Sequence, residues 1–313
     1  MKNLIVYESK YGTTKESAYI LSKIIGYSKV IKPLEFSNKD ENFDNYIFLL
    51  PVYNEKISEN ILNLIKNNIE FLIKKNIYFI IVNLLGRHDF YLKEAKDMLK
   101  DPLINMHSIN GNLILDKLDE NDLNSIKNFF TLTHSQFKDR INFNINEVIQ
   151  LTLNIKNELE IKKAALKEEI IKDIITKFIN NHNTCVISTS CDITPRATPI
   201  EYIYYKKTFY FISEGGIKFA NILRNNNVSI AIFDNYSSMN KIGGLQITGK
   251  ASFVEFASEE YYEIMTLKNI NSSAINKLDI ILNIIKVDIE KIEALNTDFK
   301  KYNGDSKQIL YKL

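Results

Sequence analysis

The sequence of 313 residues has few of the side chains that most often carry chemistry unaided. It contains two cysteines, four histidines and no tryptophan. Cys185 and Cys191 form neither a disulfide framework nor a metal-ligand pattern, which favours a reducing compartment. The histidines lack the spacing of a zinc motif. We therefore expect neither a disulfide scaffold nor a structural zinc site.

An excess of charge and long apolar runs are also missing. Forty basic residues face 38 acidic ones, a formal net charge of +2, which gives no reason to expect nucleic acid or an anionic membrane as partner. The sequence contains no run of 18 apolar residues, the length needed to span a bilayer. Its first residues lack the basic, apolar and small-residue order of a signal peptide. The expectation is a cytoplasmic protein with no membrane partner.

Catalytic signatures based on side chains are absent as well. The sequence has no G-x-S-x-G elbow, and neither cysteine has an evident histidine partner. If the chain is an enzyme, a bound cofactor performs the chemistry and the protein positions it and controls access.

The first half alternates apolar and amphipathic segments. Strand-like runs occupy 4–8, 46–52, 78–85 and 112–118, with a shorter one over Val30–Leu34. Helical periodicity fills 14–25, 58–75, 91–99 and 120–130. Near-continuous apolar strands that alternate with helices predict an α/β domain with a parallel five-stranded sheet.

The second half has a different rhythm. A helix is expected over 159–182, and a shorter one follows Lys218. Short β-rich runs occupy 184–190, 196–205, 208–214, 228–234 and 244–255, which favours an antiparallel barrel. The tail 306–313 is read as a final strand or docking segment. The expected domains are 1–135 and 161–313, joined by a polar connecting segment, 136–160.

The loop between the first strand and the first helix is built like an anion site. Backbone N–H groups and the positive end of the helix dipole point into such a loop. Gly12 permits close approach, and Ser9, Thr13 and Thr14 offer hydroxyl groups. The alternative is a capped helix start, with Thr13 or Thr14 as N-cap. Neither a triphosphate loop nor a G-x-G-x-x-G motif is present.

These residues carry a resemblance. "YESKYGTTKESAYILSKI" and "FLLPVYNEKISENILNLI" resemble the first two flavin loops of flavodoxins, in particular the branch of flavodoxin-like protoporphyrinogen oxidases, over residues 1–135. The resemblance implies an FMN phosphate site and a ring site at the carboxyl edge of the sheet. The implied phosphate ligands are Ser9, Tyr11, Gly12, Thr13 and Thr14. The implied ring contacts are Pro51, Val52, Tyr53 and Asn54.

The third loop, "LLGRHDFY" at 84–91, departs from the flavodoxin pattern. It has no acidic, glycine-rich run and carries Arg87 and His88. His88 or Tyr91 either stacks on the flavin or faces solvent.

The second half resembles the FMN-binding split barrels related to pyridoxamine phosphate oxidase. The landmarks, from "TCVISTSCDITPRATPIEYIYY" through "SEGGIKFANILRNN" to "LQITGKASFV", occur in order from about residue 165 to 255. The resemblance implies FMN at a homodimer interface. The implied ring contacts are Arg196, Ala197, Thr198, Pro199 and, from either subunit, Gln246. The implied phosphate neighbours are Ser213, Glu214 and Lys218.

Lys218 beside a glycine turn would suit a phosphate dianion on physical grounds alone. The alternative is a solvated lysine at the start of a helix, and Gly215 and Gly216 stand where many relatives place a hydroxyl or a second cation. The aromatic run at 200–212 could stack nucleic-acid bases, but such strand aromatics are more often barrel core.

His134, among the phenylalanines of "FFTLTHSQF", is a candidate axial ligand for haem between the domains; the alternative is simple packing.

The combined resemblance implies an FMN-dependent oxidoreductase of haem utilisation, of the anaerobilin-reductase type. Its acceptor would be haem or a linear tetrapyrrole, and its donor a reduced nicotinamide or a redox protein. The alternatives are a general flavin or quinone reductase, or a non-catalytic carrier of electrons or haem.

Overall fold

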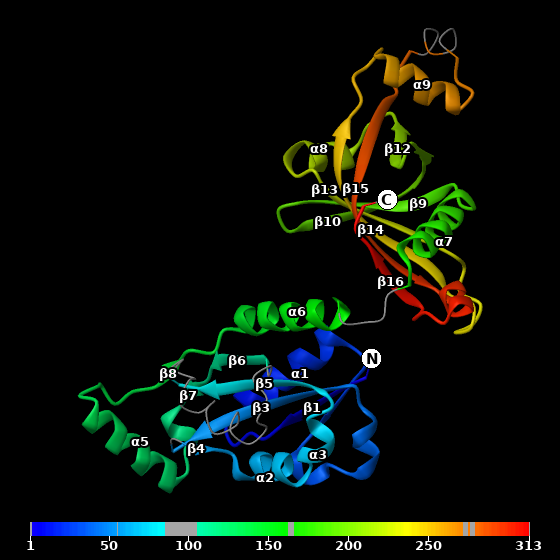
Figure 1. Cartoon of the computed structure of the whole chain (residues 1–313). Coiled ribbons are helices and arrows are strands. Elements are labelled where there is room, and N and C mark those ends of the chain that lie inside the picture. The colour runs from blue at the N-terminus through cyan, green and yellow to red at the C-terminus, as the bar shows by residue number, and fades with distance from the viewer. Residues whose placement is uncertain are drawn as a thin grey trace. The chain divides into compact units, whose positions relative to one another are not determined.

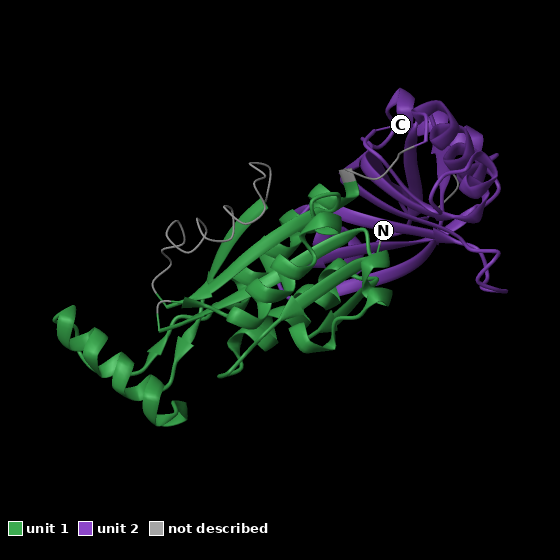
Figure 2. Ribbon diagram, turned by 60° about the horizontal axis from the view of Figure 1, so that its bottom comes forward, with its two compact units in different colours: residues 1–163 green, residues 164–313 purple. Residues whose placement is uncertain are grey.

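The computed structural model describes residues 2–54, 56–84, 105–161, 166–271, 275 and 279–312 (Figure 1). The chain divides into two compact units, 1–163 and 164–313, which Figure 2 shows in different colours. Among the described residues, no helix is long and apolar enough to cross a membrane.

The first unit is built on a parallel sheet. Its strands follow the order β2-β1-β3-β5-β6, and the short β4 pairs antiparallel with β3. The strands are β1 (Asn3–Tyr7), β2 (Ser28–Ile31), β3 (Asn45–Tyr53), β4 (Lys56–Ile57), β5 (Asn76–Asn83) and β6 (Asn105–Asn110). The chain moves from β1 outward to β2, then returns past β1 to β3. The order therefore reverses between β1 and β3, which is the flavodoxin-like arrangement.

Helices cover both faces of this sheet (Figure 1). Alternate residues of β1 show the layering, because Leu4 and Val6 face one core and Ile5 and Tyr7 the other. The first core includes side chains of α2 (Glu59–Asn67) and α3 (Ile69–Leu72). The second includes side chains of α1 (Thr13–Ile25) and α6 (Ile145–Ile161). The expected α/β sandwich is confirmed.

Two details of the first unit differ from the sequence prediction. A strand at 112–118 is wrong: the fifth parallel strand is β6, and Asn112–Leu113 forms β7, which pairs with β8 (Arg140–Ile141). Among the described strands β6 pairs only with β5, and this edge position permits its polar sequence. The segment 136–160 holds most of α6, whose Val148, Ile155 and Leu159 are buried in the first unit. The helix expected at 91–99 lies outside the described residues.

The second unit is an antiparallel split barrel, as expected. Its sheet has the order β10-β9-β13-β14-β15-β12-β11, and β16 also pairs with β15. The strands are β9 (Thr184–Cys191), β10 (Thr194–Glu201), β11 (Ile203–Tyr205), β12 (Thr208–Ser213), β13 (Asn227–Phe233), β14 (Gly243–Phe253), β15 (Asn283–Asn296) and β16 (Lys307–Leu310). The last of these confirms the predicted terminal strand.

Helix α7 (Glu168–Asn180) contributes Ile171, Ile175 and Ile179 to the main core of this unit, which also holds Ile187, Ile230 and Ile247 of the sheet. Helix α8 (Ile217–Arg224) follows β12, and α9 (Glu259–Leu267) packs on a smaller apolar cluster. The helix predicted over 159–182 is two helices, α6 and α7, because α6 ends at Ile161 and α7 begins at Glu168.

The longest strand of the barrel, β15, is missing from the sequence prediction. Its charged residues alternate with buried ones, so one side faces the core and the other faces water. β14 pairs antiparallel with β15, and the register of this pairing shifts between Thr248 and Gly249. A Cβ on Gly249 would lie 2.5 Å from the Asp288 carbonyl oxygen, so the close approach of the two strands requires glycine there.

Candidate functional site

The loop that follows β1 lies where the strand order reverses, at the carboxyl ends of β1 and β3. Contacts join it to the segment after β3: the Lys10 backbone N–H donates to the Tyr53 hydroxyl at 2.8 Å, and Asn60 Nδ2 donates to Glu8 Oε1 at 2.8 Å. The two predicted flavin loops are therefore neighbours in the fold.

Gly12 caps the N-terminus of α1 with φ 102°, a backbone conformation that favours glycine. An added Cβ there would have no heavy atom within 4 Å among the described residues, so the position opens into free space. The Gly12 N–H donates to Ser9 Oγ at 3.0 Å. The Ser9 side chain thus stabilises the conformation of the loop through a hydrogen bond within it.

The next three N–H groups begin α1. Those of Thr13, Thr14 and Lys15 find no hydrogen-bond acceptor in the described ranges of the chain, and no side chain caps the helix. Thr14 is buried, and Thr13 Oγ1 accepts a long bond of 3.5 Å from the Asn112 N–H. Neither threonine serves as N-cap, because Gly12 holds that position. Unpaired donors at a helix N-terminus suit an anion such as a phosphate group.

The predicted ring contacts divide into two pairs. Pro51 is buried inside β3 opposite Val82, and Val52 packs half-buried against the core under α2. Tyr53 and Asn54 lie at the end of the strand. The ring of Tyr53 meets that of Tyr11 edge to face, with centroids 5.8 Å apart. The end of β3, and not its interior, therefore borders the loop.

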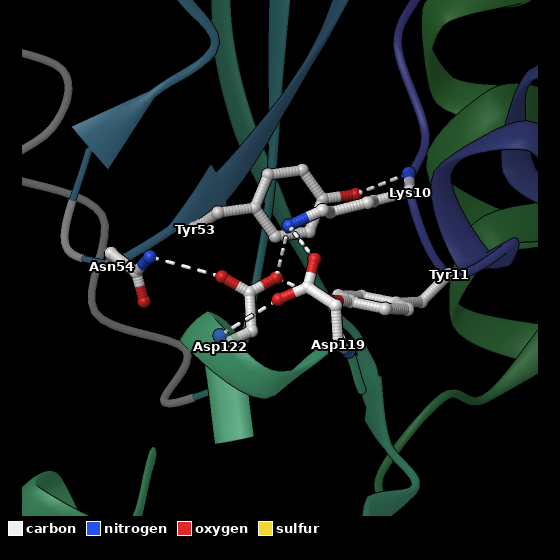
Figure 3. Close-up of polar contacts among 6 residues, drawn as sticks. All are labelled: Lys10, Tyr11, Tyr53, Asn54, Asp119 and Asp122. Atoms are coloured by element: carbon white, nitrogen blue, oxygen red, sulfur yellow. Dashed lines mark hydrogen bonds and ion pairs between the residues drawn. The ribbon is translucent and has the colours of Figure 1, made fainter. Parts of the chain in front are cut away.

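Figure 3 shows a polar cluster at the same edge, to which α5 (Glu120–Leu132) contributes. Lys10 Nζ lies 2.5 Å from Asp119 Oδ2 and 2.6 Å from Asp122 Oδ2. The Tyr11 hydroxyl also donates to Asp122 Oδ2, and Asn54 Nδ2 donates to Asp122 Oδ1 at 3.0 Å. Asp122 therefore receives three donors from two separate loops.

Hydrogen bonds and ion pairs in the cluster shift the pKa values of its charged groups. Burial would raise the pKa of Asp122, but hydrogen bonds from Lys10, Tyr11 and Asn54 outweigh it, and the pKa lies below its usual value. The pKa of Asp119 is lowered chiefly by Lys10, and that of Lys10 is raised by both carboxylates. All three groups are charged at neutral pH, so the Lys10 ammonium is already neutralised.

Sequence reasoning missed Asp119 and Asp122. The available signal was local: Asp119 is the N-cap of α5, with its side chain accepting from the Asp122 N–H at 2.9 Å. That signal places a helix start, but it gives no hint of the contact with Lys10, more than a hundred residues away in sequence.

Two predicted histidines have different outcomes. His88 lies outside the described residues. His134 belongs to the first unit and is exposed, with φ 50°, in the turn that ends α5. The backbone N–H of His134 donates to the Thr131 carbonyl. In the described part of the chain, no cluster of three or more His, Cys, Asp or Glu residues could hold a metal ion.

The second candidate site surrounds the start of α8. Lys218 is buried, with 8% of its surface exposed, and its Nζ donates to the Gly215 carbonyl at 2.7 Å. Burial lowers the pKa of Lys218 and outweighs the nearby charge of Glu214, which raises it; a smaller repulsion from Arg196 lowers it further. No carboxylate of the described residues pairs with it within 4 Å. A buried ammonium without a direct ion-pair partner can take an anionic ligand, although Glu214 already supplies one negative charge nearby.

The sheet register sorts the predicted ring contacts of the barrel. Thr198 pairs with Ile187, which pairs with Ile230, so Thr198 shares the inner face; its Oγ1 is buried and has no hydrogen-bond partner among the described residues. Arg196 shares that face by alternation. Ala197 is exposed on the opposite, outer face.

Pro199 and Gln246 share this outer face, in one row through Val186 and Ala231. Gln246 therefore lies on the opposite surface of the sheet from Thr198 and Arg196. Ser213 lies next to the turn, with its Oγ 3.4 Å from the Gly215 N–H, and Glu214 is exposed. Of the predicted residues, the structure thus brings Arg196, Ser213, Glu214 and Lys218 to one region.

Comparisons with known proteins match both units. Residues 4–139 match the flavodoxin domain family, and residues 171–296 match the pyridoxamine 5'-phosphate oxidase family. No curated protein matches the chain.

Among solved structures, a pyridoxamine 5'-phosphate oxidase candidate from Listeria innocua is 25% identical, covering 40% of this chain and 98% of its own, with a TM-score of 0.34. HutZ, a haem storage protein from Vibrio cholerae, is 14% identical (45% and 94% covered, TM-score 0.33). ChuZ from Campylobacter jejuni is 18% identical (48% and 64% covered, TM-score 0.35). These structural matches are partial, and no functional statement follows from them. The two matched domains together indicate a flavin-binding redox function.

Proposed function

We propose that this protein is an FMN-dependent oxidoreductase whose first unit holds FMN by its phosphate group. The observation that carries the proposal is the start of α1, where the N–H groups of Thr13, Thr14 and Lys15 lack acceptors among the described residues beside the open space at Gly12. This cradle lies at the point where the strand order reverses. A phosphate dianion fits it, because free amides and the helix dipole both favour negative charge.

The residues present fit the remaining parts of FMN as well. Ser9 and Thr13 bring hydroxyl groups to the loop, and Tyr53 and Asn54 form the adjacent border. Lys10 is held by Asp119 and Asp122, so phosphate recognition rests on neutral donors. Bound FMN supplies the electron and hydride transfer that these side chains cannot perform. The chain itself binds and orients the cofactor.

The second unit supports a further anion site. Lys218 and Arg196 place two positive charges near the N-terminus of α8, against one negative charge from Glu214. Thr198 has a buried hydroxyl group on the inner face, and no described residue forms a hydrogen bond with it. We infer that this region binds either a second FMN or the propionates of a tetrapyrrole. Gln246, on the outer face, would reach a flavin only from a partner subunit, which is why we expect a homodimer.

The proposed acceptor is haem or a linear tetrapyrrole, with a reduced nicotinamide or a redox protein as donor. The sequence resemblance to haem-utilisation flavoproteins motivates this choice, and the paired cations of the second unit are compatible with propionates. Oxidation of reduced nicotinamide that depends on added bilin would support the enzyme. Stoichiometric haem uptake without turnover would identify a carrier instead, and turnover with quinones alone would identify a general reductase.

The proposal is tested by FMN titration of the full chain and of a Thr13→Val/Thr14→Val variant, with flavin fluorescence as readout. Valine preserves the shape of threonine and removes the hydroxyl group. Loss of FMN from the variant, with its melting temperature maintained, supports the first site. Full retention would contradict a role of these two hydroxyl groups; valine keeps the backbone N–H groups, so the amide cradle itself is tested by Gly12→Ala. For haem, His134→Ala should change the Soret band only if this exposed histidine is an axial ligand.

A further inference from the structure

Helix α5 contacts the candidate flavin site through its first turn. Its buried side chains are Asp122 near the start and Phe130 near the end. Phe130 is held between Arg140, 4.8 Å from its ring, and Phe137, 5.7 Å away between centroids. The far end of α5 is thus anchored by aromatic packing, and the near end by Asp122.

Asp122 accepts from donors on both loops that border the site. Lys10 Nζ and the Tyr11 hydroxyl come from the loop after β1, and both reach Oδ2. Asn54 Nδ2 comes from the end of β3 and reaches Oδ1 at 3.0 Å. Asn54 has φ 49°, so its position depends on a backbone conformation that few residues adopt. Figure 3 shows the two loops meeting at this one carboxylate.

A carboxylate suits this position because it accepts at both oxygens and donates at neither. An amide of the same shape would turn its NH2 group toward a donor in either orientation: toward Lys10 and Tyr11, or toward Asn54. Asparagine therefore cannot satisfy both loops at once. Asp122 is also 5% exposed, so its charge is stabilised by these donors and hardly by water.

Resting on the proposed function, we propose that Asp122 is a positioning residue that supports FMN binding. Through α5, it ties the loop after β1, which would hold the phosphate, to the end of β3, which would border the ring. In this proposal Asp122 acts through the two loops and makes no contact of its own with the cofactor. It fixes Lys10 and Tyr11, the two residues directly before Gly12, relative to Asn54. Binding to a preorganised loop costs less conformational entropy than binding to a loose one. Loss of the tie should therefore weaken FMN binding without removing any group from the cradle.

The test compares Asp122→Asn with Glu120→Gln in the full chain. Both variants remove one negative charge from the first turn of α5, but Glu120 is exposed and lies outside the cluster. Both are made on a Lys218→Met background, so that flavin held by the second unit does not contribute. Readouts are the FMN dissociation constant and the visible circular dichroism of bound flavin at saturation, with melting of the apoprotein measured in parallel.

We expect Asp122→Asn to weaken FMN binding about tenfold, or about 1.4 kcal/mol, and to alter the dichroism of bound flavin. Glu120→Gln should stay within about twofold of the parent chain. If Asp122→Asn does not fold, Lys10→Met removes one donor to the carboxylate without touching an implied phosphate ligand, and it should weaken binding about threefold. For Asp122→Asn, or for its substitute, parent-like affinity with an unchanged spectrum overturns the inference.

Tighter binding of FMN to Asp122→Asn would also overturn it, because that result would mean that Asp122 withholds Lys10 from the phosphate. Failure of the proposed function has a different signature: the chain carrying Lys218→Met alone would then bind no FMN, whatever residue stands at position 122.

Discussion

Gly12→Ala separates backbone strain from cofactor binding. The substitution adds a methyl group at φ 102°, where no described heavy atom lies within 4 Å. Its cost to folding is therefore conformational and not steric. Holding a residue with a side chain in this region costs roughly 1–3 kcal/mol, and the stiffer unfolded chain returns roughly 0.4–1 kcal/mol.

The net loss of about 1–2 kcal/mol corresponds to a fall of roughly 2–8 °C in the melting temperature of a unit of this size. Binding should suffer more. The new methyl group occupies open space at the start of α1, where the proposal places the phosphate. Losing one charge-assisted hydrogen bond costs about 1.5–3 kcal/mol, so FMN affinity should fall roughly 10- to 150-fold.

Gly26→Ala is a matched control, because Gly26 caps the other end of α1 with φ 68° and is equally open. The assay is FMN titration with thermal melting of each apoprotein. Both variants should lose similar stability, and Gly12→Ala alone should lose FMN. Equal FMN affinity in the two variants would refute the phosphate cradle.

Three further predictions concern other parts of the chain. Lys218→Met should abolish binding of inorganic phosphate or FMN by the second unit, measured by calorimetry; unchanged binding there would contradict an anion site at α8. Gly249→Ala should lower the free energy of unfolding by about 1–3 kcal/mol, whereas Gly244→Ala, whose Cβ would make ordinary contacts, should change it little; equal effects in denaturant titrations would contradict the close approach of β14 to β15. Folding lowers the pKa of Asp122, so the ionised carboxylate stabilises the folded state above about pH 4, and this contribution disappears as the pH falls through the pKa of the folded state. The free energies of unfolding of Lys10→Met and of the parent chain should therefore converge below that pH. A difference that persists at pH 2 would contradict this.

The layered core of the first unit could be predicted from the sequence because its strands are buried on both faces. Leu4 to Tyr7 and Tyr46 to Leu50 are all buried, and such apolar runs leave a local signal. The edge strand β6 left none, because a strand with one neighbour needs few apolar residues. The prediction took the apolar run that follows it instead.

The candidate site was predictable only where its residues are adjacent in the chain. Ser9 to Thr14 form one loop, so their common role follows from a strand, a glycine and a helix start. Asp122 belongs to the site through contacts with Lys10 and Tyr11 across more than a hundred residues. The register of β10 likewise divides Thr198 from Pro199, although the two are neighbours in sequence. Neither relation has a local signal.

The most direct measurement of the central claim is the amount of FMN bound per chain, determined by titrating the purified full-length protein and releasing the flavin for quantification. The account predicts at least one FMN per parent chain at micromolar concentration, and one fewer in Gly12→Ala. A parent chain that binds no FMN at that concentration, or a Gly12→Ala chain that retains all of it, would contradict the account.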